Sequence, residues 1–114
     1  MDAGKAILRR ARVSPQKARL VANLVRGCDV DEALSKLTFT RKKTAPMLKK
    51  LIESAIANAE NQDPEIDIDD LYVKTVMVDQ GPSLRRYRPR AMGRATPVKK
   101  QTSHITVVLA TREE

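Results

Sequence analysis

The residues best suited to binding chemistry lie in one stretch, residues 81–102, which reads GPSLRRYRPRAMGRATPVKKQT. The stretch has no acidic residue, and its seven basic residues are Arg85, Arg86, Arg88, Arg90, Arg94, Lys99 and Lys100. Its sizeable apolar residues are only Leu84, Tyr87, Met92 and Val98. Guanidinium groups make forked hydrogen bonds to phosphates, and lysines add compact positive charge. The chemistry indicated is therefore the binding of a polyanion.

Two strand candidates flank this stretch, Leu71–Val78 and His104–Thr111, both rich in β-branched residues. A basic insert between two pairing strands predicts an arm held out from a folded body. As a hairpin, the insert would extend roughly 30 Å at ~3.3 Å per residue. An isolated two-stranded ribbon is marginal in water, so we expect the arm to become ordered against a polyanion. A disordered basic loop without a specific partner is the alternative.

The composition predicts one domain over residues 1–114, in which residues 81–102 form the arm. The 114 residues are 41% apolar and 32% charged, with a net charge of +8, which is typical of nucleic-acid binding. A soluble basic protein without such a partner is the alternative. Aromatic residues make up only 3% of the chain, so stacking on aromatic side chains is not expected to be the main binding mode.

Catalytic and metal sites are not expected. His104 and Cys28 are the only histidine and cysteine, which leaves no intramolecular disulfide, no cysteine-based metal site and no set of catalytic partners. The acidic run Asp63–Asp70 lacks the glycine and closing glutamate of a calcium loop. No apolar run approaches the ~20 residues of a membrane span, and Met1–Arg10 lacks the apolar core of a signal peptide. We therefore expect no cofactor, no membrane partner and a cytosolic location.

The first half of the chain predicts a strand and a helix. Lys5–Val13 is strand-like, and its basic residues could form either a solvated or a phosphate-facing edge. Ser14 and Pro15 suit the N-cap and first position of a helix. That helix should bury a stripe at helical spacing and end at Gly27. The residues of the stripe are Leu20, Val21, Leu24 and Val25.

Two more helices are predicted before the acidic run. Asp29 and Glu32 have capping-box spacing, and the short helix that follows should bury Ala33, Leu34 and Leu37. Phe39 is expected to fill the corner between helices. The longest helix starts either at Ala45, capped by Thr44, or near Arg41 with a bend at Pro46. Its predicted buried face is Ala45, Leu48, Ile52, Ala55, Ile56 and Ala59.

These elements predict an α+β fold, in which three helices cover one face of a small three-stranded antiparallel sheet and a long basic β-hairpin protrudes. Three segments then resemble one family, the large-subunit ribosomal protein numbered twenty-two in its bacterial form: Ala11–Gly27, Lys49–Asn61 and Val78–Ala110. The motifs SPQKARLV, ESAIANAE, PRAxGRA and TSHITVV occur in the family's order and spacing. The resemblance covers nearly the whole chain.

The resemblance implies a structural protein that binds ribosomal RNA, supports subunit assembly and lines the nascent-polypeptide exit tunnel with its hairpin. The implied partners are large-subunit ribosomal RNA, neighbouring large-subunit proteins and the nascent polypeptide; homo-oligomers are not expected. The residues expected to contact RNA are Arg9, Arg10, Arg12, Lys17, Arg19, Arg85, Arg86, Arg88, Arg90, Arg94, Lys99 and Lys100. The segment of macrolide response corresponds to Leu84, Arg85 and Arg86. The tunnel tip corresponds to Arg90, Ala91, Met92, Gly93, Arg94 and Ala95.

Two departures from the family pattern lie in the arm. Met92 stands where a basic residue is common, and Pro97 stands where a charged or apolar residue is usual, so nascent-chain stalling is not carried over to this chain. Two rival classes remain to be weighed. A free-standing regulator would need a readout element such as a helix-turn-helix, and a small nuclease would need a base or metal beside the basic surface; the sequence carries neither pattern.

Overall fold

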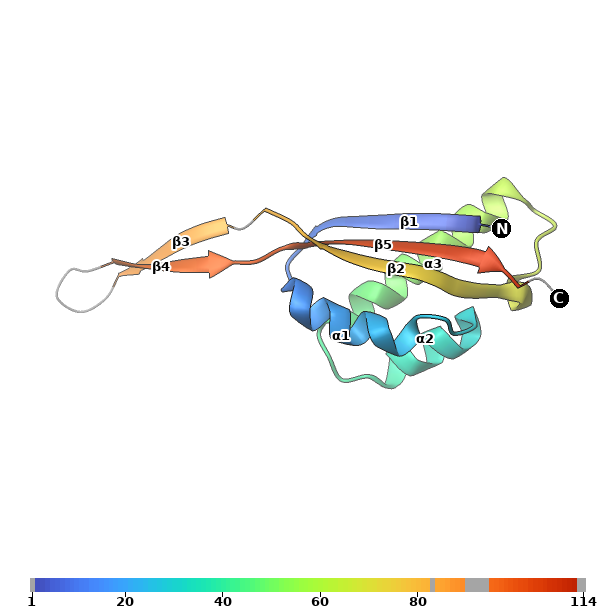
Figure 1. Ribbon diagram of the computed structural model, residues 1–114, viewed down its shortest axis with the longest axis horizontal. Helices are drawn as coiled ribbons and strands as arrows, with labels where there is room; N and C mark the ends of the chain where they lie inside the picture. The colour runs from blue at the N-terminus through green and yellow to red at the C-terminus, as the bar shows by residue number, and fades with distance from the viewer. Residues whose placement is uncertain (1, 83, 90–94, 113–114) are drawn as a thin grey trace.

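The computed structural model describes residues 2–82, 84–89 and 95–112, and for 84–89 and 95–100 it describes the backbone alone (Figure 1). The elements are β1 (Asp2–Ala11), α1 (Pro15–Val25), α2 (Val30–Phe39), α3 (Thr44–Gln62), the 3₁₀ turn η1 (Ile68–Asp70), β2 (Leu71–Gln80), β3 (Leu84–Pro89), β4 (Ala95–Lys100) and β5 (Ser103–Thr111). Two sheets result, one in the body of the molecule and one in the arm.

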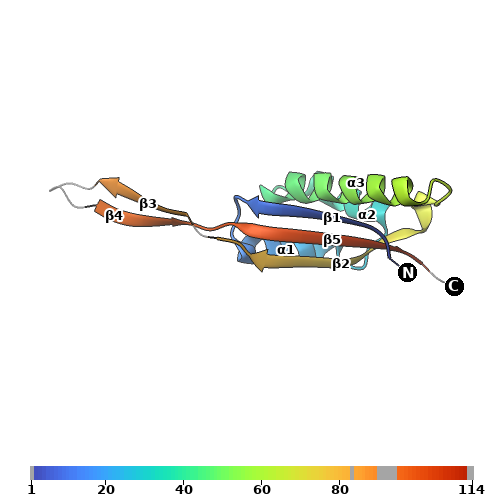
Figure 2. The ribbon, with the colours of Figure 1, turned by 90° about the horizontal axis from the view of Figure 1, so that it is seen from above.

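The body sheet has the strand order β1-β5-β2, and both of its pairings are antiparallel. The helices cover one face of this sheet, with α3 packed mainly against β1 and α1 against β2 (Figures 1 and 2). The predicted α+β architecture, three helices on a three-stranded antiparallel sheet, is therefore confirmed. The central strand, β5, follows the arm in the sequence and pairs with both edge strands.

The core lies between that sheet face and the helices. Ile52 of α3, Val21 and Val25 of α1, and Val107 and Leu109 of β5 are all fully buried. Each such side chain contributes roughly 1.5–3 kcal/mol relative to an exposed one. The small residues of α3, such as Ala55, let the helix approach β1 closely at Gly4.

The helix boundaries follow the predicted signals closely. The Ser14 hydroxyl accepts a hydrogen bond from the Lys17 amide at 3.4 Å, which confirms the N-cap of α1. Gly27 terminates α1 with a φ of 83°, a conformation that glycine adopts without strain. Helix α3 begins at Thr44, with Lys43 rather than the predicted Thr44 at its N-cap. Pro46 therefore lies in its first turn, where a missing amide hydrogen leaves no broken helical bond.

The predicted stripe of α1 is partly wrong. Leu20 is 55% exposed and Leu24 is 43% exposed, whereas Ala18, Val21 and Val25 are buried. Each leucine of the stripe directly precedes a valine, so the two leucines and the two valines lie on faces of the helix about 100° apart. The sequence did not decide which of these two faces packs against the sheet. The helix turns its small residues toward the sheet and leaves the larger leucines at the surface.

Two further expectations for α2 are wrong. Phe39 does not fill a corner; it is 81% exposed at the last position of the helix. Asp29 occupies the N-cap but makes no side-chain capping bond. Its carboxylate instead accepts a hydrogen bond from Nε of Arg112 at 2.6 Å, since the chain's far end lies beside it. Glu32 pairs with Lys36 at 3.4 Å rather than reaching back to the cap.

The strand boundaries differ from the predicted ones by a few residues. The predicted strand Lys5–Val13 begins and ends earlier than expected, because β1 runs over Asp2–Ala11. Near its end the pairing with β5 shifts register between Leu8 and Ala11, where Arg10 adopts a φ of 56°. β2 extends to Gln80, and β5 begins at Ser103. Hydrogen bonding thus continues to the point where the arm leaves the body.

The arm is the second sheet, in which β3 pairs with β4 from Leu84↔Lys100 to Pro89↔Ala95. Figure 1 shows this ribbon projecting along the long axis, away from all three helices. The two antiparallel strands confirm the predicted hairpin legs, while the predicted turn at Met92 and Gly93 lies outside the described residues. The molecule measures 66 × 26 × 17 Å along its principal axes, so the arm makes it strongly elongated.

Candidate nucleic-acid interface

Three consecutive polar side chains fix the place where the arm meets the body. The Thr102 hydroxyl donates to the Pro82 carbonyl, and the Ser103 hydroxyl, which is buried, donates to the Val13 carbonyl at 2.7 Å. The next residue, His104, accepts the backbone amide of Arg10 through Nδ1 at 3.0 Å. His104 therefore has a structural role at the end of β1.

A basic depression, which we call the neck groove, lies beside this junction. It is lined by Arg12, Val13, Ser14, Lys17, Leu20, Lys42, Lys43, Thr44 and Gln101, and its volume is about 720 Å³. The four cations come from the β1–α1 connection, from α1 and from the segment before α3, and the lining contains no acidic residue. A depression with this lining attracts anions.

The helix ends strengthen that preference. Both α1 and α3 begin at the neck groove, and neither has an acidic residue in its first turn. The first amides of a helix carry partial positive charge because they lack intrahelical partners. Two positive helix ends and four cationic side chains thus face one small region, which suits a phosphate backbone.

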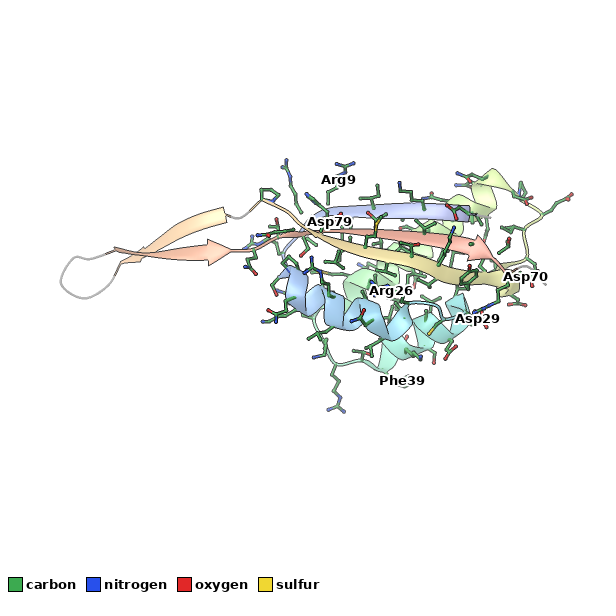
Figure 3. The ribbon with its side chains drawn as sticks, viewed as in Figure 1. Arg9, Arg26, Asp29, Phe39, Asp70 and Asp79 are labelled. Atoms are coloured by element: carbon green, nitrogen blue, oxygen red, sulfur yellow. The ribbon has the colours of Figure 1, made fainter. Side chains whose placement is uncertain are left out.

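The predicted RNA-contact residues of the body occupy different places. Arg12 and Lys17 line the neck groove, whereas Arg9 and Arg10 lie on exposed parts of β1 (Arg9 is labelled in Figure 3). Arg19 donates from Nη2 to the Val78 carbonyl at 3.0 Å, so part of its guanidinium is engaged in a hydrogen bond to the edge strand β2. The neighbouring Arg26, not among the predicted contacts, does the same for Val76 at 2.6 Å.

The predicted contacts in the arm fall on both of its strands. The segment Leu84–Arg86 begins β3, and Arg88 lies near its end. Lys99 and Lys100 end β4, where their Cα partners on β3 are Arg85 and Leu84. Of the predicted tip, Ala95 is the first residue of β4, and Arg90–Arg94 lie outside the described residues.

Negative charge gathers at the opposite end of the molecule. The acidic run lies between α3 and β2, and Figure 3 shows Asp70 at the end of the body away from the arm. The carboxylates of Asp63 and Asp67 each accept a hydrogen bond from the backbone amide two residues later. No group of His, Cys, Asp and Glu within residues 2–82 and 101–112 is arranged to hold a metal.

The ionisable pairs of the body are exposed surface pairs. Lys74 donates to Asp2 at 2.7 Å, which lowers the pKa of Asp2 and raises the pKa of Lys74. The Cys28 sulfur and the Glu32 carboxylate raise the pKa of Lys36. Exposed pairs of this kind contribute little to stability, and none of these residues lines the neck groove.

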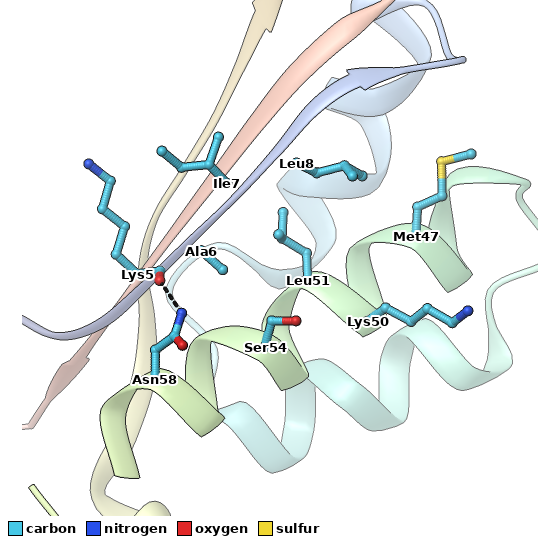
Figure 4. A pocket seen from close by; sticks show the side chains of 9 residues that line it. All are labelled: Lys5, Ala6, Ile7, Leu8, Met47, Lys50, Leu51, Ser54 and Asn58. Atoms are coloured by element: carbon cyan, nitrogen blue, oxygen red, sulfur yellow. Dashed lines mark hydrogen bonds between the residues drawn. The ribbon is translucent and has the colours of Figure 1, made fainter. Parts of the chain in front are cut away.

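A second depression lies between β1 and α3 and has a volume of about 840 Å³ (Figure 4). Its lining is mainly apolar, with Lys5 and Lys50 at its rim, and Asn58 donates to the Lys5 carbonyl at 2.7 Å. No histidine, cysteine or carboxylate lines it, so it lacks the side chains that most often act as general acids and bases. No helix in the described part of the chain is long and apolar enough to cross a membrane.

The sequence did not predict that Lys42 and Lys43 join Arg12 and Lys17. They lie in the exposed segment before α3, far from Arg12 and Lys17 in the sequence. The roles of Thr102 and Ser103 were missed as well, although both lie in the TSHITVV motif that carried the family resemblance. The buried Ser103 hydroxyl gives no local signal in the sequence, because its partner, the Val13 carbonyl, is 90 residues away.

Comparison with known proteins gives a consistent result. Residues 6–110 match the sequence model of the family described as ribosomal protein L22p/L17e. The large ribosomal subunit protein uL22 of Bdellovibrio bacteriovorus is 66% identical over 105 residues, which are 92% of this chain and 94% of that protein. The protein of the same name from Desulfotalea psychrophila is 60% identical over 105 residues, with the same two coverages. The chain therefore belongs to the ribosomal protein L22p/L17e family, as a structural, non-enzymatic protein of the large ribosomal subunit in the cytoplasm.

Proposed function

We propose that the chain binds large-subunit ribosomal RNA through the neck groove and the arm together, and that this binding supports subunit assembly. One observation carries the proposal: β3 and β4, which belong to the acid-free basic stretch of the sequence, project from the body beside a groove lined by four more cations. The two basic regions meet at the Thr102–His104 junction. A polyanion bound in the groove can therefore continue along the arm and contact its basic residues.

Charge supplies most of the proposed affinity. A cation that neutralises a phosphate releases a counterion, so affinity falls with salt with a slope of ~0.7–0.9 per contact. The arm supplies seven basic residues, and the groove supplies Arg12, Lys17, Lys42 and Lys43. Arginine predominates in the first half of the arm, which favours forked contacts to phosphates.

We further propose that the arm lines the nascent-polypeptide exit tunnel, with neighbouring large-subunit proteins and the nascent chain as its other partners. The support is the family membership together with the shape of the arm, a narrow ribbon of two six-residue strands. A ribbon is thin enough to enter RNA and to present one side to a passing chain. The macrolide-response segment Leu84–Arg86 lies at the base of this ribbon, and the tip residues are proposed to narrow the tunnel.

The RNA proposal is tested by replacing Arg85, Arg86, Arg88 and Arg90 with alanine. We expect weaker binding to protein-free large-subunit RNA and a salt slope lower by up to about three. The matched control removes four positive charges elsewhere, from Lys5, Lys49, Lys50 and Lys74, and should change the slope much less. An equal fall for both variants would mean that net charge, rather than the arm, sets the affinity.

The tunnel proposal needs its own measurement. A photo-crosslinking residue at Arg86 should capture a radiolabelled nascent chain on stalled ribosomes, while the same residue at Lys49 on α3 should not. Deletion of Leu84–Arg86 should also alter the macrolide response. Capture from neither position, with a macrolide response equal to that of the unaltered protein, would contradict the tunnel role and leave RNA binding intact.

A further inference from the structure

Phe39 is the most exposed large apolar side chain in the described residues, at 81%. Burying an aromatic side chain contributes roughly 1.5–3 kcal/mol to stability, and the fold leaves that contribution unused here. The exposure of Phe39 does not reflect poor packing of α2, because Leu37, two residues earlier, is buried as expected. The ring is therefore available for a partner.

Hydrogen bonds fix the backbone turn that carries the ring. The Thr40 hydroxyl donates to the Lys36 carbonyl at 2.7 Å, and the Thr40 amide donates to the Leu37 carbonyl at 3.3 Å. The Thr38 hydroxyl donates to the Leu34 carbonyl at 2.8 Å. These bonds hold the last turn of α2 in place although it faces solvent. Figure 3 shows Phe39 at the outer edge of the helical layer.

A small hollow adjoins the ring. It has a volume of about 470 Å³ and is lined by Leu24, Ser35, Lys36, Phe39 and Thr40. Its apolar surface comes from one aromatic and one aliphatic side chain, and its polar rim comes from hydroxyl groups and one lysine. A flat, partly polar ligand with a π-face matches this lining better than a purely aliphatic one.

The charge beside the hollow is strongly positive. The exposed run Arg41, Lys42 and Lys43 follows Phe39 by two residues. The charge of Lys36 is already shared with Glu32, 3.4 Å away, so the run of three supplies the free positive charge. An aromatic ring beside several cations is the arrangement by which proteins hold single-stranded nucleic acid, with a base on the ring and phosphates on the cations.

The hollow also lies close to the neck groove, although the two share no lining residue. Lys42 and Lys43 line the groove, and Leu20 of the groove lies one helical turn from Leu24 of the hollow, about 6 Å along α1. A nucleic-acid strand seated in the groove would therefore meet Phe39 next along the same surface.

We propose that Phe39 and its hollow form a stacking site for one unpaired base of RNA, whose neighbouring phosphates are held by Arg41, Lys42 and Lys43. The inference rests on the proposed RNA binding and adds a ligand class to it. A surface that binds through charge alone would bind paired and unpaired RNA equally. A stacking contact with an aromatic ring requires an unpaired base outside a helix. The site thus selects a bulge or loop next to the RNA that the groove holds.

The test uses the full-length protein and protein-free large-subunit RNA. Phe39→Ala should weaken binding about 5- to 150-fold, the range for loss of one aromatic–base stack. The salt slope should stay unchanged because no charge is removed. Phe39→Tyr should retain the affinity. Since Phe39 is exposed, none of these changes should alter the thermal unfolding of the free protein.

A second readout observes the ring directly. The chain has no tryptophan, so Phe39→Trp places a single fluorescent reporter at the site, and stacking with a base should quench it on RNA binding. The control Met77→Trp places the reporter on the open sheet face, at a residue that is 47% exposed; it should not be quenched.

Wild-type affinity for Phe39→Ala together with an unquenched Phe39→Trp on saturated RNA would overturn the stacking site. Quenching that appears only when other large-subunit proteins are added would assign the surface to a protein partner and would overturn it equally. Failure of the unaltered protein to bind RNA at all would instead count against the proposed function itself.

Discussion

The body and the arm of this molecule are stabilised in different ways. In the body, β5 pairs on both sides and the helices bury a continuous core against it. In the arm, β3 and β4 pair only with each other, and residues 81–102 carry seven basic and four sizeable apolar residues. The body is specified by its own packing, whereas the arm depends on what surrounds it. One short chain thus separates stability from binding.

The largest expected effect is the loss of RNA affinity, without loss of stability, when the arm is removed. Replacing residues 84–100 with a short glycine-containing turn should lower RNA affinity about a hundredfold or more, because most of the basic arm is lost. The free energy of unfolding of the body should change by less than about 0.5 kcal/mol, as surface changes usually do. Filter binding and chemical denaturation measure the two quantities. A body that no longer unfolds cooperatively would show that the arm helps to stabilise it.

A single methyl group should disturb the body strongly. A Cβ at Gly4 would come within 2.3 Å of the Ala55 carbonyl oxygen, so Gly4→Ala must push β1 away from α3. We expect a loss of about 3 kcal/mol, at the upper end for overpacking. Gly27→Ala is the control: it has no atom within 4 Å but a φ of 83°, which predicts a loss of about 1–2 kcal/mol. Equal losses would mean that close packing at Gly4 costs no more than backbone strain at Gly27.

The junction between the two regions should respond in both properties. Ser103→Ala leaves the Val13 carbonyl without its buried donor, which predicts a loss of about 1–2 kcal/mol in the free energy of unfolding. RNA affinity should fall as well, because the arm and the neck groove would lose their fixed relation. Ser54→Ala on the exposed face of α3 is the matched control. Unchanged stability and affinity for Ser103→Ala would show that the backbone alone sets the junction.

The smallest effect concerns the end of the body farthest from the arm. Lys74 lowers the pKa of Asp2 from its ordinary 3.8, so the pair is present at neutral pH. Its contribution is lost as the pH falls through the lowered pKa. Lys74→Met should return the pKa of Asp2 toward 3.8, as measured by NMR titration. An Asp2 pKa that does not move would show that the pair does not persist in solution.

Much of the body could be predicted because its signals are local. Ser14 and Pro15 begin α1, Gly27 ends it, and alternation defines the strands. The errors arose where distant residues decide the outcome. Asp29 does not cap α2 with its side chain, because Arg112, 83 positions away, takes its carboxylate and also lies over the Tyr72 ring at 4.6 Å.

The candidate interface could be predicted in the arm but only partly in the body. Charge and the absence of acids identify residues 81–102 without any three-dimensional information. The neck groove needs the fold, because Arg12 and Lys42 are far apart in sequence and meet only when α1 and α3 begin at the same place. Phe39 was misassigned because an apolar residue at a helix end has the same pattern whether it is buried or presented to a partner.

The central position of β5 also determines when the body can form during synthesis. β1 and β2 pair with β5 and not with each other, and β5 follows every other element in the chain. Until Ser103–Thr111 has left the ribosome, two strands have no partner and the helices have an incomplete sheet to cover. Pairings that span the whole chain form slowly, and the unpaired strands are open to aggregation in the meantime. A new copy of this protein is therefore exposed to chaperones and to RNA before its body has folded.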